Sequence, residues 1–483
     1  MIFNSSVFLL FFFIFFLLYR IIFDKNLRIQ NIILLVGSYF FYVWTDWRLL
    51  SYLIAVSILN YLLGILIEKE NNQFKKKLYL NVGLIQGIGG LLYFKYFNFF
   101  IDSFNDLFQL LHISLNLQTL NIIVPLGISF FTFRIISYLL DIDKGKIKAT
   151  KDWIIFFNYV SFFPSLLSGP IDKAKLLVPQ LEKKREFDQG RIIDGMRQIL
   201  WGLFKKAVIA DNIATITNQI FDNYQDLSGS TLLLGAFFYT IQIYADFSGY
   251  TDMAIGIARL LGFNITKNFD FPYFSQNIAE FWRKWHISLT AWLTEYVFTP
   301  LSIAFRDHGK AGLILAIVIN FTLVGIWHGA NWTYILFGFL HGLYFIPLIL
   351  KGKMNKKIKT DKSTLFPTLK EFLNMLSNFI LVMFTFIIFR ANNIEHAWNF
   401  FINIFSKSIF TFPHFFGMRH ALITGLLTIV FIFIEWKGRN GEFALERFGL
   451  KWKTPIRWAL YYGIIISIIW YTGEQQQFIY FQF

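Results

Sequence analysis

The sequence predicts an all-α protein that crosses a membrane many times. Of its 483 residues, 55% are hydrophobic and only 16% are charged, and the mean hydropathy is +0.50. Uncharged runs recur along the chain at about 20 residues each, the length at which a helix crosses the hydrocarbon core of a bilayer. We expect about 11 to 13 membrane helices in one membrane domain, residues 1–483, with residues 1–120 as N-terminal helices, 121–350 as the core that bears the motifs and 351–483 as C-terminal helices.

The expected helices follow the apolar runs between charged links. They lie near residues 3–23, 31–47, 49–67, 78–98, 121–141, 153–170, 192–212, 231–260, 311–329, 332–350, 372–390, 421–436 and 457–472. The first run has neither the basic start nor the small-residue cleavage site of a secretory signal. We therefore expect it to stay in place as the first membrane helix.

Two segments do not fit a simple crossing. The run 153–170 contains Pro164 and ends in Gly169-Pro170, which predicts a re-entrant or broken helix sheltered by protein. Residues 276–305 mix tryptophans with charged side chains. That mixture predicts a helix in the membrane interface, with its aromatic rings at the level of the lipid headgroups.

The distribution of basic residues predicts the orientation. Alternate links hold 35 of the 45 Lys and Arg residues, and the opposite links hold four. Because basic links stay in the cytoplasm, both chain ends are expected outside. This topology also explains the net charge of +15 without a nucleic acid partner. The basic links are 20–30, 67–78, 142–152, 171–191, 262–290, 305–310, 351–373 and 437–458. The outer links are 1–6, 44–50, 98–121, 213–231, 330–332, 390–420 and 473–483, and their four basic residues are Arg48, Arg390, Lys407 and Arg419.

Several kinds of chemistry find no support in the sequence. The chain has no cysteine, which excludes disulfides, thiolate nucleophiles and Cys-ligated metals. It has no HExxH pattern, no pair of histidines at helical spacing and no phosphate-binding loop, so no metal site is expected.

Ionisable residues within the apolar runs are the candidates for function, because a charge there costs roughly 2.5 kcal/mol or more. Five stand out: Arg134, Asp246, Asp252, His328 and His341. His328 ends one apolar run, and the next begins after only three residues, so the turn must be tight. An imidazole facing water can act as a general base at neutral pH.

Structural roles remain open for all of these residues. His328 could bond a backbone carbonyl at a helix end, and His341 could be a packed core residue. Asp246 and Asp252 could form a carboxylate pair, or could serve Arg134 or a helix terminus. His286, beside a tryptophan, could rest at the headgroups.

Six stretches together resemble the membrane-bound O-acyltransferase family, in particular its alginate O-acetyltransferase branch. They occur in the family's order over nearly the whole chain. The stretches are residues 124–145, 162–174, 244–301, 325–345, 389–393 and 478–483, and they include the sequences LSGPID, RKWHISL, WHGANW and FIYFQF.

The resemblance implies a helical fold around a central tunnel or funnel. It implies that His328, in the WHG motif, is catalytic and that His286, in RKWHISL, lies beside it on the donor side. We assign Arg283, Lys284, Trp285, Asp246 and Asn331 to substrate binding. Among these, Arg283 and Lys284 would attract the phosphates of an anionic donor.

The resemblance also implies a reaction and its partners. The donor would be a cytosolic thioester, acetyl-CoA or an acyl carrier, used as a substrate rather than as a bound cofactor. The acyl group would pass to an extracytoplasmic partner transferase of the SGNH or serine type, which modifies a polysaccharide. Three alternatives stay open: D-alanyl transfer to teichoic acid, a transporter, and a scaffold for an export complex.

Overall fold

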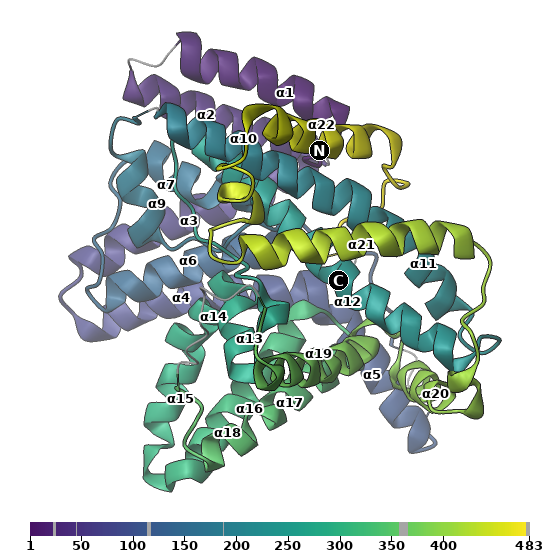
Figure 1. Cartoon of the computed structure of the whole chain (residues 1–483). Helices are drawn as coiled ribbons and strands as arrows, with labels where there is room; N and C mark the ends of the chain where they lie inside the picture. Colours follow the sequence, from purple (N-terminus) through teal and green to yellow (C-terminus); the bar gives the residue numbers. More distant parts are fainter. Residues whose placement is uncertain (23–25, 45, 114–116, 187, 357–365, 480–483) are drawn as a thin grey trace. The chain divides into compact units, whose positions relative to one another are not determined.

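The computed structural model describes residues 1–22, 26–44, 46–113, 117–186, 188–356 and 366–479, and every regular element in this part of the chain is a helix (Figure 1). The predicted all-α class is therefore confirmed. The chain divides into two compact units. Unit 1 contains Met1–Gly195 and Ile257–Thr266, and unit 2 contains Met196–Gly256 and Lys267–Phe483. The single domain with three parts, which the sequence predicts, stays a prediction.

Unit 1 is built around two helix groups. In one, α2 packs on α7, and in the other, α3, α4 and α6 pack on one another. The helices that lie wholly in unit 1 are α1 (Ser6–Phe16), α2 (Leu27–Val43), α3 (Trp47–Lys69), α4 (Gln73–Leu91), α5 (Phe97–Leu110), α6 (Ile128–Asp143), α7 (Trp153–Ser161), α8 (Phe163–Leu166) and α9 (Ala174–Leu181).

The buried Arg134 explains how the segment 153–170 can be broken. The helix stops after α7 and restarts as the short α8, which confirms the predicted interruption; its re-entry into the membrane stays a prediction. The Arg134 guanidinium donates hydrogen bonds to the carbonyl oxygens of Tyr159, Val160, Ser165 and Pro170 at 3.0–3.3 Å. A backbone without helical hydrogen bonds is thus satisfied inside the protein.

Unit 2 carries the long central and C-terminal helices. Two helices, α10 (Gln189–Leu203) and α12 (Gly229–Leu260), cross the boundary between the units. The others are the π-helix η3 (Phe204–Ala210), α11 (Asp211–Asp222), α13 (Ile278–Lys284), α14 (Ile287–Leu293), α15 (Thr299–Ala304), α16 (Gly309–His328), α17 (Trp332–Tyr344), α18 (Ile346–Leu350), α19 (Leu369–Arg390), α20 (Ile394–Ile404), α21 (Met418–Gly438) and α22 (Thr454–Trp470).

The α16–α17 hairpin is the most extensive helix contact in unit 2, and its two helices run side by side in Figure 1. Two glycines allow this contact. A Cβ atom on Gly338 would lie 2.2 Å from the carbonyl oxygen of Phe321, and one on Gly325 would lie 2.1 Å from that of Tyr334. The backbones therefore touch, as small residues permit in membrane helix pairs. The hairpin fixes the position of His328 at the end of α16.

Five helices of the described chain are long and apolar enough to cross a membrane. They are Trp47–Lys69, Arg306–His328, Trp332–Leu350, Leu369–Arg390 and Met418–Gly438. Two shorter apolar helices, Ser6–Arg20 and Leu27–Val43, accompany them. The larger number of crossings that the sequence predicts stays a prediction.

The expectation of one continuous helix over residues 276–305 is wrong. The segment forms the short helices α13, α14 and α15, separated by a break and a π-helical turn, rather than one helix. Its aromatic side chains Phe281, Trp282, Trp285 and Trp292 are each no more than 5% exposed, so they are buried within unit 2, and the level of the segment in the membrane interface stays a prediction. Their rings pack on one another, as Trp285 does on Phe281 at 5.4 Å, which buries more apolar area than an interfacial position would.

Some helix boundaries also differ from those that the apolar runs predict. The helix expected from residue 121 begins only at Ile128, because Gly127 takes a left-handed φ of 71° after Pro125. Three helices, α5, α11 and α20, lie largely in links that were expected to be loops. All three are amphipathic, and their polar faces interrupt the apolar runs from which helices were predicted.

Candidate active site

His328 lies where the sequence predicts it, in a tight turn. It ends α16, and α17 begins after Gly329, Ala330 and Asn331. Its side chain is 4% exposed, and its ring packs edge-on against Phe389 at a centroid distance of 5.0 Å. The imidazole is therefore held among aromatic rings rather than facing open solvent.

His286 lies in the same aromatic cluster, so the structure brings the two predicted histidines together. Its ring is 5.4 Å from that of Trp327 and 4.7 Å from that of Phe247. Trp327 in turn packs on His328 at 5.0 Å, and it thus contacts both imidazoles. The side chain of His286 is fully buried, and burial lowers the pKa of His286 to about 3. It is neutral at physiological pH.

The backbone of His286 is unusual for a non-glycine residue. Its φ of 42° is left-handed, which costs of order 1–3 kcal/mol and is common at functional sites. Asn268 holds this turn from the neighbouring strand-like segment: its carbonyl oxygen accepts from the Ile287 N–H at 2.9 Å, and its side-chain oxygen accepts from the Ser288 hydroxyl at 2.7 Å. The ring of His286 is therefore presented by a fixed turn.

The three residues before His286 have different surroundings. Arg283 is exposed and donates to the carbonyl oxygen of Met354 at 3.3 Å. Lys284 pairs with Glu280 at 2.8 Å. Trp285 is buried in the aromatic core. Arg283 is thus exposed and Lys284 partly exposed, whereas Trp285 is not exposed.

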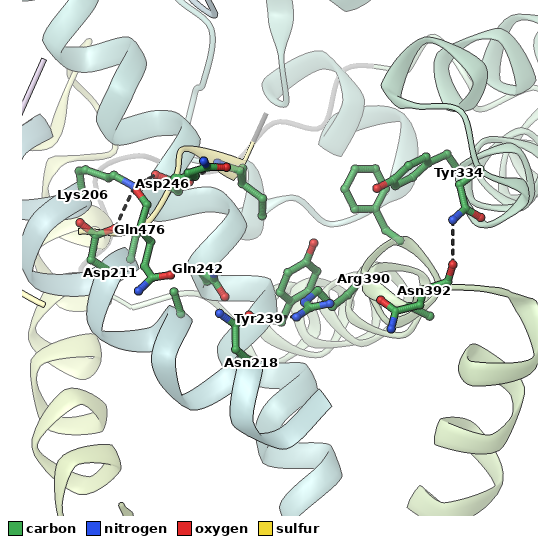
Figure 2. Close-up of a pocket in the computed structure, with 17 residues that line it drawn as sticks. Lys206, Asp211, Asn218, Tyr239, Gln242, Asp246, Tyr334, Arg390, Asn392 and Gln476 are labelled. Atoms are coloured by element: carbon green, nitrogen blue, oxygen red, sulfur yellow. Dashed lines mark hydrogen bonds and ion pairs between the residues drawn. The ribbon is translucent and has the colours of Figure 1, made fainter. Parts of the chain in front are cut away.

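A cavity of about 250 Å³, which we call the polar cavity, lies in unit 2 (Figure 2). Two predicted substrate-binding residues, Asp246 and Asn331, line it, and so does Phe389, whose ring packs on His328. His328 itself is not among the lining residues, but its ring contacts Phe389, which is one of them. The lining residues are Lys206, Ala210, Asp211, Ala214, Asn218, Tyr239, Gln242, Asp246, Asn331, Tyr334, Phe389, Arg390, Ala391, Asn392, Gln476, Gln477 and Ile479.

Asn331 connects the histidine turn to another wall of the cavity. Its side-chain oxygen caps α17 by accepting from the Thr333 N–H at 3.0 Å. Its amide nitrogen donates to the carbonyl oxygen of Asn392 at 2.8 Å, in the loop that follows α19. The dashed line between these groups in Figure 2 marks this bond.

A buried ion cluster forms the opposite wall. The Lys206 ammonium lies 2.8 Å from a carboxylate oxygen of Asp211 and 2.8 Å from one of Asp246. It also donates to the carbonyl oxygen of Gln476 at 3.2 Å, and Asp246 accepts from the Ile479 N–H at 2.8 Å. The C-terminal segment is thus attached to the cluster. Residues 480–483, the end of the FIYFQF stretch, lie outside the described residues.

The interpretation of Asp246 and Asp252 needs correction. Neither partners Arg134, which bonds carbonyl oxygens in unit 1, and they do not share a site as a carboxylate pair. Asp252 pairs instead with Lys205 at 2.5 Å, and Asp246 pairs with Lys206. The sequence FKKAVIA places both lysines in an apolar run, so a complete search for charges in apolar runs would have found them.

His341 has the core position that the sequence left open. Its side chain is fully buried, and its Nδ1 atom accepts from the Trp282 indole N–H at 3.2 Å. Its ring packs on Phe337 at 4.4 Å. Among the described residues, no group of three or more His, Asp or Glu side chains is arranged to hold a metal ion.

Comparison with known proteins identifies the family. The model of the MBOAT, membrane-bound O-acyltransferase family matches residues 147–390. The "Probable alginate O-acetylase AlgI" of Azotobacter vinelandii is 36% identical over 434 residues, which cover 88% of this chain and 82% of the relative. A peptidoglycan O-acetyltransferase of Helicobacter pylori is 32% identical, with coverages of 77% and 73%. A teichoic acid D-alanyltransferase of Bacillus subtilis is 30% identical, with coverages of 57% and 71%. The chain belongs to the membrane-bound O-acyltransferase family and is an integral membrane O-acyltransferase.

Proposed function

We propose that this protein takes an acetyl group from a cytosolic thioester and transfers it to a hydroxyl group on the outer side of a bacterial inner membrane, for modification of a polysaccharide. The alginate and peptidoglycan O-acetyltransferases among the relatives support an acetyl group and a polysaccharide as the final acceptor. The D-alanyltransferase matches a smaller share of this chain, which makes D-alanyl transfer the less favoured alternative.

The polar cavity carries the proposal. It is lined by residues from four of the links that the charge asymmetry predicts to be outside, namely 213–231, 330–332, 390–420 and 473–483. A hydroxyl that enters from that face would reach Phe389, against which His328 packs. His286 contacts the same indole, Trp327, as His328 does, which supports a place for His286 beside the proposed base.

The reaction then follows from ordinary acyl transfer. His328 takes the proton of the acceptor hydroxyl as its oxygen attacks the thioester carbonyl carbon. The tetrahedral intermediate collapses, the carbon–sulfur bond breaks, and the departing thiolate receives the proton. Neutral His286 can donate one hydrogen bond to the acyl group or to the developing oxyanion. The donor is acetyl-CoA, and the acceptor is the hydroxyl of a partner transferase of the SGNH or serine type, which passes the group to the glycan.

Histidine substitution tests the proposal. The full-length protein in nanodiscs, incubated with labelled acetyl-CoA and acceptor, should lose about 10²- to 10⁴-fold in rate when His328 becomes Ala, because general base catalysis contributes that much. His308→Ala is the matched control, since His308 is exposed near the opposite end of α16. Full acylation by the His328→Ala protein would favour a scaffold or a transporter instead.

The donor site and the orientation have separate tests. Replacement of both Arg283 and Lys284 by Gln should raise the KM for acetyl-CoA, and an unchanged KM would remove them from the donor site. Because the chain has no cysteine, single cysteines report sidedness without background. Lys407→Cys should react with an impermeant maleimide added to intact cells and Lys310→Cys should not; the reverse pattern would overturn the topology.

A further inference from the structure

Tyr239 presents a hydroxyl that no described residue satisfies. The side chain is 1% exposed, and its ring is fixed between Phe221, at a centroid distance of 5.7 Å, and Phe386, at 6.5 Å. The hydroxyl oxygen is buried and has no hydrogen-bond partner in the described chain. Nearly all buried polar atoms in proteins have a partner, so an exception in the wall of a cavity indicates that something in the cavity supplies it.

The position of Tyr239 on α12 supports this view. Tyr239, Gln242 and Asp246 are spaced i, i+3 and i+7, so they share one helix face, and all three line the polar cavity. Two of them have protein partners: Gln242 accepts from the Thr217 hydroxyl at 2.6 Å, and Asp246 pairs with Lys206. For the Tyr239 hydroxyl, in contrast, no described residue supplies a hydrogen bond. In Figure 2 it lies between the Lys206 side and the Arg390 side of the cavity.

The size of the polar cavity limits what the ligand can be. Its 250 Å³ is below the roughly 300–1,000 Å³ of ordinary small-molecule pockets, so it admits one small group rather than a length of glycan. Six amide side chains in the lining can both donate and accept hydrogen bonds. The formal charges of its two cations and two carboxylates cancel, which favours a neutral occupant. A single hydroxyl-bearing side chain of a polypeptide meets these conditions.

We infer that Tyr239 binds the acyl acceptor: its hydroxyl donates a hydrogen bond to an oxygen atom of the polypeptide whose side chain enters the polar cavity. The inference rests on the proposed function, in which the acceptor approaches His328 from this cavity. In the absence of the acceptor, a water molecule can take the place of that oxygen. Binding exchanges this water for a fixed partner, which orients the acceptor hydroxyl before attack.

Removal of one oxygen atom tests the inference. The probes are labelled acetyl-CoA and a short serine-containing peptide, with the full-length protein in nanodiscs. Tyr239→Phe should raise the KM for the peptide about three- to tenfold, the value of one hydrogen bond, and leave the KM for acetyl-CoA unchanged. Tyr42→Phe is the matched control, because its hydroxyl is also buried without a partner among the described residues but lies in unit 1; it should change neither value.

Two further measurements exclude a merely structural effect. Without peptide, the Tm of the Tyr239→Phe protein should be no lower than that of the wild type, because the lost hydroxyl has no protein partner. With peptide, the rise in Tm through binding should be smaller than in the wild type. A Tm that falls without peptide would assign Tyr239 a structural role and overturn the inference.

The remaining outcomes separate the inference from the proposed function. A peptide KM unchanged in Tyr239→Phe would overturn the inference alone, provided that His328→Ala is inactive. If the wild-type protein acylates an oligosaccharide of uronic acids and not the peptide, the acceptor is not a polypeptide and the inference is overturned. Full activity of His328→Ala would instead refute the proposed function.

Discussion

The contact between α16 and α17 gives a prediction whose magnitude follows from the structure. In Gly338→Ala the new Cβ atom would lie 2.2 Å from the carbonyl oxygen of Phe321 and 2.8 Å from the backbone nitrogen of Gly325. Backbone atoms cannot rotate away, so the helices must separate, and overpacking of this kind costs typically 1–3 kcal/mol. Alanine also favours a helix by up to about 1 kcal/mol over glycine, which offsets part of that cost.

Gly463→Ala isolates the steric effect. Gly463 lies within α22, and a Cβ atom there would meet nothing within 4 Å. Both variants gain the same helix propensity, so the difference between their free energies of unfolding equals the steric cost, about 1–3 kcal/mol. Gly463→Ala should therefore be as stable as the wild type or more so, and Gly338→Ala less stable.

The assay combines stability and activity. Thermal unfolding of the two variants in the same detergent gives the order of stability, and acetyl transfer gives the effect on the site. Separation of the helices displaces His328 from Asn331 and Phe389, and a displacement of about 1 Å can cost 10²-fold in rate. A Gly338→Ala protein that matches Gly463→Ala in both Tm and rate would refute the backbone contact.

Three further predictions concern charged and titrating groups. Lys206→Met should lower the free energy of unfolding by about 3–5 kcal/mol, because two buried carboxylates lose their cation; Lys267→Met, whose 2.6 Å pair with Asp270 is partly exposed, should cost less than about 1 kcal/mol. Because the pKa of His286 is lowered to about 3, His286→Gln should lower the rate without moving the acid limb of its pH profile, and a shifted limb would contradict a neutral His286. Burial raises the pKa of Asp172 from 3.8 to about 6, so between these pH values the native state binds a proton that the unfolded state has lost. The free energy of unfolding should therefore fall as pH rises from about 4 to 6. Asp172→Asn should flatten this dependence of the free energy of unfolding on pH.

Local patterns in the sequence were sufficient to predict much of the fold and the position of His328 in a tight turn. Pro164 and the Gly169-Pro170 pair predict the break after α7. The three residues between two apolar runs predict the turn of the α16–α17 hairpin. Both depend on near neighbours in the chain, so they could be predicted. The same is true of the all-α class, which follows from the length and spacing of apolar runs.

Pairings across the chain could not be predicted in this way. Trp285 was expected at the headgroups because its neighbours are charged, yet its ring is buried by Phe269 and Phe386, which come from other elements. Tyr239 has no local signal, because a tyrosine in an apolar helix is ordinary and only the cavity beside it makes its hydroxyl unusual. Amphipathic helices such as α5 were missed since apolar length, rather than periodicity, decided the prediction.

The spacing of Asp246, Gly249 and Asp252 acquires a physical explanation in the structure. The two carboxylates, six residues apart on α12, pair with the neighbouring lysines Lys206 and Lys205 of the π-helix η3. Gly249 lies between them because the two elements touch there: a Cβ atom would be 2.9 Å from the carbonyl oxygen of Gly202 and 3.1 Å from the Cβ of Lys205.

The wide turn of η3 separates the roles of these adjacent lysines. Lys205, which pairs with Asp252, lines a small recess together with Lys267 and Glu442. These last two residues belong to links that are predicted to be cytoplasmic. Lys206 instead lines the polar cavity. One ion pair therefore lies toward each predicted face of the membrane, and the buried charges are matched on both sides of Gly249. A bulky residue at 249 would force η3 from α12 and expose both ion pairs together, so the glycine, rather than either aspartate alone, couples the wall of the polar cavity to the recess beside Lys205.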